Sequence, residues 1–189
     1  MLLFSINPPT DLQDDYYKNH NKHVQRTVKS WAVVLLVIYI ILIGMAVFRL
    51  TGPDSSSERA TPIFNLIFYA IGLVTWVLLL IGSWNLIWWL FLPKIVDLFC
   101  FTIYMGATTV LSIIETIGIV AMNDNQYNAY AKDHAATAGS TKLWTVCMSA
   151  VAALILFLIT SIILHMFGVV VRACQHAYFA EKSGDKDFV

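Results

Sequence analysis

Four ionisable side chains lie within or at the edge of two otherwise apolar stretches of this sequence, where a charge is costly to bury. They are Asp97, Glu115, His165 and Arg172. Ionisable residues within apolar spans usually face the protein interior and pair with another group. Two roles fit such residues: a path for protons or ions, or polar contacts that hold neighbouring helices together.

The spacing of these residues predicts two polar helix faces. Asp97 and Glu115 are 18 residues apart, which is five complete turns at 100° per residue, so they share one face of a helix. Tyr104, Thr108 and Ser112 fall on the same face. A second stripe lies on a later stretch, at spacings of four, three and four residues, and comprises Ser161, His165, Gly168 and Arg172.

The two faces can be aligned in one antiparallel register. Residues at equal depth in two antiparallel helices have a constant sum of residue numbers, and a sum of 269 matches acid with base, phenol with imidazole, and hydroxyl with hydroxyl. The pairs are Asp97 with Arg172, Tyr104 with His165, and Thr108 with Ser161. The sequence therefore predicts a polar seam, acting either as interhelical contacts of about 0.6 kcal/mol each or as an ion path.

Glu115 has no polar partner in that register, because the matching residue is Leu154. A lone carboxyl in a low dielectric is expected to be neutral. We expect it either to bond Asn65, Ser149 or Thr145, or to point out of the bundle at another subunit.

The composition indicates that these residues lie on membrane-spanning helices. Of the 189 residues, 58% are hydrophobic and 13% are charged, against about 25% charged in soluble domains. A span needs about 20 apolar residues, and four runs qualify: 31–50, 63–83, 95–122 and 143–171. The predicted fold is an all-α integral membrane four-helix bundle over residues 31–171. Residues 1–30 and 172–189 form its two terminal segments.

The chain must turn back between the second and third runs. As one helix, residues 63–122 would be about 90 Å long, so we expect a hairpin at the membrane interface over Trp84–Pro93, or a re-entrant dip. Eight Lys and Arg residues lie in the two terminal segments and at the end of this turn, where Lys94 follows Pro93, and four lie in or beside the other two loops. The positive-inside bias therefore predicts that both termini are cytosolic.

Both terminal segments carry short signals. Thr10 and Gln13 have capping-box spacing, which predicts either a helix from about Asp11 through the first span or an unstructured tail up to Lys29. Cys174 follows the fourth span and is a candidate for S-palmitoylation. The last residues resemble an acidic-class PDZ ligand that could bind by β-augmentation; they are Asp187, Phe188 and Val189.

The layout resembles tetraspan proteins of the lysosomal-associated transmembrane type and their invertebrate relatives. The resemblance lies in four spans, short loops and the exit of the fourth span, Val169-Val-Val-Arg-Ala-Cys-Gln-His-Ala-Tyr-Phe179. The Pro-Pro-x-Tyr motifs of the lysosomal members do not occur in this sequence. The resemblance implies an adaptor or accessory protein in the plasma membrane or an endolysosomal membrane.

No catalytic constellation, metal-ligand spacing or cofactor motif is recognisable, so we expect neither an enzyme nor a cofactor. The twelve basic and twelve acidic residues balance, which gives no basic surplus for nucleic acid. The sequence predicts a non-catalytic accessory or scaffold subunit that contacts lipid and either a larger membrane protein or further copies of itself. The alternative is a small transporter or oligomeric channel that uses the polar seam.

Overall fold

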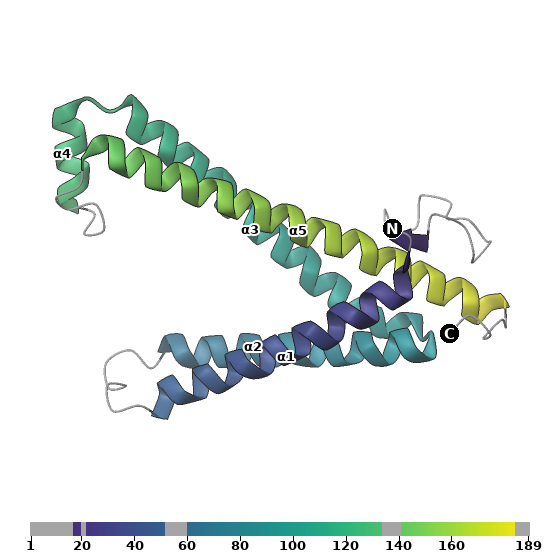
Figure 1. The fold of residues 1–189 in the computed structure, drawn as a ribbon. Coiled ribbons are helices and arrows are strands. Elements are labelled where there is room, and N and C mark those ends of the chain that lie inside the picture. Colours follow the sequence, from purple (N-terminus) through teal and green to yellow (C-terminus); the bar gives the residue numbers. More distant parts are fainter. Residues whose placement is uncertain (1–16, 20–21, 52–59, 134–140, 184–189) are drawn as a thin grey trace. The chain divides into compact units, whose positions relative to one another are not determined.

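The computed structural model describes residues 17–19, 22–51, 60–133 and 141–183 (Figure 1). Its four long helices are apolar enough to cross a membrane, which confirms the predicted helical, multi-pass class. They are α1 (Val24–Thr51), α2 (Ala60–Asn85), α3 (Leu92–Ala121) and α5 (Lys142–Ser183). Each covers one of the four apolar runs, and α5 continues well past residue 171.

Four short elements complete the described chain: β1 (Lys18–Asn19), β2 (Lys22–His23), the 3-10 helix η3 (Trp88–Phe91) and α4 (Asp124–Asp133). β1 and β2 are antiparallel, with Lys18 opposite His23. The predicted continuous N-terminal helix is therefore wrong over its described part, because α1 begins only at Val24. Tyr17 and His23 instead pack their rings on His176, and such tertiary contacts override local helix propensity. Residues 11–16 lie outside the described chain.

The structure divides into two compact units. The first unit combines the chain up to Leu98 with the chain from Met166 onward, and the second unit is Phe99–His165. Helices α3 and α5 each contribute residues to both units.

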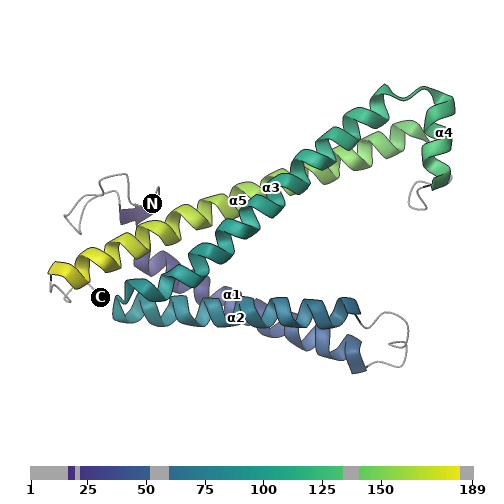
Figure 2. The same cartoon turned by 180° about the vertical axis from the view of Figure 1, so that it is seen from behind.

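In the first unit, α1 and α2 lie side by side along their lengths in both views (Figures 1 and 2). Val28, Trp76 and Leu79 are fully or almost fully buried there. The closest approach is at Gly72, where a Cβ atom would lie 2.2 Å from Cε1 of Tyr39. Only glycine therefore allows the Tyr39 ring to rest directly on the α2 backbone.

The turn after α2 uses a left-handed cap. Leu86 has a φ of 53°, and the Ile87 amide donates to the Gly82 carbonyl at 2.9 Å, which is a Schellman-type bond. A leucine in this conformation costs roughly 1–2 kcal/mol, but burial of its side chain offsets the cost. The expected reversal between the second and third runs is therefore present.

In the second unit, α4 closes the connection between α3 and α5. The backbone amide of Asn123 donates to Oε1 of Gln126, and the backbone amide of Gln126 donates to Oδ1 of Asn123, each at 2.9 Å. This reciprocal pair is a capping box. Tyr127 joins its hydroxyl to that of Thr145 at 2.6 Å. The Lys142 ammonium donates to the backbone carbonyls of Val120, near the end of α3, and of Met122. The segment between the third and fourth runs, which was predicted only as a short loop, thus contains a docked helix.

Candidate functional site

The structure has a polar contact between α3 and α5 in the predicted register, but it lies on different faces of the two helices from those predicted. The hydroxyl pair between α3 and α5 is Thr109 with Thr160, 3.2 Å apart, and these residue numbers also sum to 269. The hydroxyls of Thr108 and Ser161 instead donate to carbonyls of their own helices, those of Tyr104 and Phe157. Each contact face is thus rotated by one residue from the expected one. Tyr104 and His165 are both exposed.

Asp97 has a different partner from the one predicted. Its Oδ2 forms an ion pair of 2.5 Å with Nζ of Lys94, three residues earlier on α3. Arg172 donates from Nε to the Gly168 carbonyl of its own helix at 3.4 Å. Lys94 reaches the Asp97 carboxylate from one turn away on the same helix, so this pair needs no alignment of two helices. The prediction compared only residues on different helices and therefore missed it.

Lys94 is the charged residue that sequence reasoning misjudged most. It was counted as a basic flank of the turn, but its side chain is almost completely buried. The ammonium lies 4.2 Å from the centre of the Trp76 ring and 6.0 Å from that of Tyr39. We call Lys94, Asp97, Trp76 and Tyr39 the lysine cluster. Aromatic faces and one carboxylate together supply the negative charge density that a desolvated ammonium requires.

A second polar cluster joins three helices of the first unit at Gln25, near the start of α1. Its Nε2 donates to the Ala173 carbonyl of α5 at 2.7 Å, and its Oε1 accepts from Ser83 of α2 at 2.9 Å. The same Nε2 lies 3.4 Å from Nδ1 of His176. Gln25, Ser83 and His176 are all buried. We call Gln25, Ser83, Ala173, His176 and His23 the glutamine cluster.

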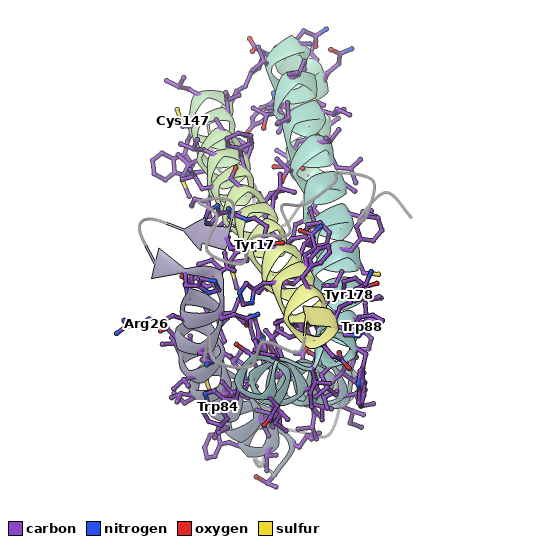
Figure 3. All side chains as sticks on the ribbon, turned by 90° about the vertical axis from the view of Figure 1, so that its right-hand side faces the viewer. Tyr17, Arg26, Trp84, Trp88, Cys147 and Tyr178 are labelled. Atoms are coloured by element: carbon purple, nitrogen blue, oxygen red, sulfur yellow. The ribbon has the colours of Figure 1, made fainter. Side chains whose placement is uncertain are left out.

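The glutamine cluster continues into the contact of α5 with the turn. Cys174 donates its thiol to the Trp88 carbonyl at 3.5 Å, and the Trp88 and Tyr178 rings meet edge to face at 5.6 Å (Figure 3). Arg26, by contrast, points outward in the same view. Cys174 is 2% exposed, so the expected lipidation would require this contact to open. The proposed tail ligand Asp187, Phe188 and Val189 lies outside the described residues.

Glu115 is bonded to a residue that was not among its predicted partners. Its Oε1 accepts from the Tyr130 hydroxyl of α4 at 2.7 Å, while Thr145 is bonded by Tyr127. Tyr130 was not among the predicted partners because no helix was predicted over the residues of α4. The hydrogen bond to the Glu115 carboxylate raises the pKa of Tyr130 to about 12.

Replacing Glu115 with glutamine should return the pKa of Tyr130 towards the ordinary phenol value of about 10. The carboxylate favours the protonated phenol, so its removal lets the proton leave at lower pH. NMR of ring-labelled tyrosine across an alkaline titration measures this, and Tyr130→Phe identifies the signal. An unchanged pKa in Glu115→Gln would show that the bond to Glu115 is not its cause.

The described residues contain no group of three or more His, Cys, Asp or Glu side chains able to hold a metal ion. The candidate functional features are the lysine cluster, the glutamine cluster and the polar face of α3 that includes Tyr104 and Glu115. Comparisons with protein-family models, with curated proteins and with solved structures each returned no match.

Proposed function

We propose that this chain is a non-catalytic accessory or scaffold subunit of a larger membrane assembly. The observation that carries the proposal is the polar face of α3 in the second unit, formed by Tyr104, Thr108, Ser112 and Glu115. Tyr104 is 64% exposed and Glu115 is also exposed. Thr108 and Ser112 are half-buried.

Such a face is poorly suited to contact with acyl chains. Ionisable and strongly polar side chains within spans normally face other protein, where their remaining hydrogen-bonding capacity can be used. Small hydroxyl residues also let a second helix approach closely. A helix of a partner subunit, or of a second copy of this chain, satisfies both requirements.

The channel alternative depended on facing polar pairs between the third and fourth spans. The hydroxyls of Thr108 and Ser161 bond their own helices, and Asp97 is paired with Lys94, so these groups form no continuous line for an ion. The accessory function is accordingly the stronger proposal. The proposal includes cytosolic termini, a location in the plasma membrane or an endolysosomal membrane, and a PDZ protein as a cytosolic partner.

The proposal predicts that Tyr104→Ala removes a stoichiometric membrane partner during purification from native membranes. Ile103→Ala is the matched control, because Ile103 is 57% exposed on the adjacent position of α3. We expect partner recovery to fall at least about tenfold for Tyr104→Ala, equivalent to about 1.4 kcal/mol of binding, and to be unchanged for Ile103→Ala. Equal recovery in both variants, or no stoichiometric partner with wild type, would contradict the proposal.

A further inference from the structure

We propose that the contact between the start of α1 and the exit of α5 is an acid-sensitive latch, opened by protonation of His176. The latch consists of the glutamine cluster. The hydrogen bond that joins α1 to α5 in this cluster runs from Gln25 to Ala173, and the His176 ring lies beside it.

The hydrogen-bond pattern fixes the protonation state of His176. A carbonyl oxygen can only accept, so the group of Gln25 that lies 2.7 Å from the Ala173 oxygen must be its NH2. The same NH2 faces Nδ1 of His176, which therefore accepts. His176 is thus neutral with its proton on Nε2, and that buried Nε2 has no hydrogen-bond partner among the residues that the structure describes.

A second proton on His176 is incompatible with this arrangement. Nδ1–H would face the NH2 of Gln25, placing two donors against each other. Turning the amide over would give Nδ1–H an acceptor, but it would then place Oε1 against the Ala173 oxygen and remove the bond between α1 and α5. Every arrangement of the protonated cluster therefore loses a contact that closes the latch.

The described groups around His176 offer an extra positive charge no compensation. His176 is completely buried, and the groups in contact with it are the His23 ring from β2 at 4.3 Å, the Tyr17 ring at 5.2 Å and the Gln25 amide from α1. Arg172 lies one turn away on α5 itself, and Ser83 is the polar group supplied by α2. None of these described groups is a carboxylate, so none of them stabilises a histidinium by charge.

The direction of the pH effect follows from proton linkage. The closed latch holds His176 neutral, whereas opening lets water reach the ring and restores its ordinary affinity for a proton. The latch is therefore at full strength above the ordinary histidine pKa of about 6.5 and weakens as the pH falls. The open population rises by up to tenfold per pH unit below that value, which gives about thirtyfold at pH 5.

Cys174 provides a built-in reporter, because it is buried beside Ala173. Its labelling by 4,4′-dithiodipyridine is measured in the full chain in lipid nanodiscs, with the exposed Cys100 and Cys147 replaced by serine. A variant that keeps Cys100 and has Cys147 and Cys174 replaced corrects for the effect of pH on the reagent. The expected corrected rate rises about thirtyfold between pH 8 and pH 5.

Three variants identify the group that titrates. His176→Gln and His176→Asn can each accept from the Gln25 amide without titrating, and both should give a flat profile. His23→Gln removes the neighbouring imidazole and should retain the rise. A flat wild-type profile, a rise that persists in both His176 variants, or a rise abolished by His23→Gln would overturn the proposal.

Discussion

Replacing Asp97 with leucine should lower the free energy of unfolding by about 3 kcal/mol or more. The substitution leaves the Lys94 ammonium buried against Trp76 without its carboxylate, and an unpaired buried charge of this kind typically costs about 3–5 kcal/mol. We expect the lower part of that range, because the Asp97 side chain is 24% exposed. Unfolding of the detergent-solubilised protein by heat or denaturant measures the loss.

The double variant Lys94→Met with Asp97→Leu is the control. A buried pair replaced by apolar residues of similar size is often close to neutral, so the double variant should recover most of the stability lost in Asp97→Leu. A double variant as unstable as the single one would mean that Asp97 acts through something other than its pairing with Lys94.

Substituting valine at Gly72 should separate α1 from α2 locally and cost about 1–3 kcal/mol, the range for forcing extra atoms into a packed interface. The new Cβ would clash with the Tyr39 ring, at 2.2 Å from its Cε1 atom. That ring also packs edge to face with Tyr69, at 6.3 Å between centroids, and lies 6.0 Å from the Lys94 ammonium. The ring therefore moves only by giving up its place in the lysine cluster.

Two further variants isolate the cause of that loss. Gly44→Ala lies in open space on α1, with nothing within 4 Å of the added atom, and should be neutral or stabilising by up to about 1 kcal/mol. Adding Tyr39→Leu to Gly72→Val should restore part of the stability. Equal effects at Gly44 and Gly72 would contradict a steric origin.

Apolar run length and composition were enough to predict the four long helices and the reversal near Trp84–Pro93, because these depend on local chemistry and bilayer thickness. The rotation of the helices was not predictable in the same way. Helix α3 carries polar side chains on more than one face. To predict whether Thr108 or Thr109 faces α5, one needs to know how both helices pack. A stripe of spaced polar residues marks a face without saying what covers it.

The two buried clusters were missed for a related reason. Lys94 follows Pro93 at the turn and reads as an interfacial charge, and nothing local shows that Trp76 lies beside it. Gln25 and His176 are 151 positions apart, and they meet only because α5 continues past its apolar run. The signal that was available was the lack of any helix breaker between residues 171 and 183, where α5 continues.

Photocrosslinking in native membranes tests the proposed accessory function most directly. A benzoylphenylalanine is placed at Tyr104 in one variant and at Ile103 in another, and the products are separated by mass after irradiation. Position 104 should give a discrete product heavier than the chain, containing one partner or a second copy, and position 103 should give only lipid adducts. Lipid adducts alone at position 104 would contradict the proposal that this face binds protein.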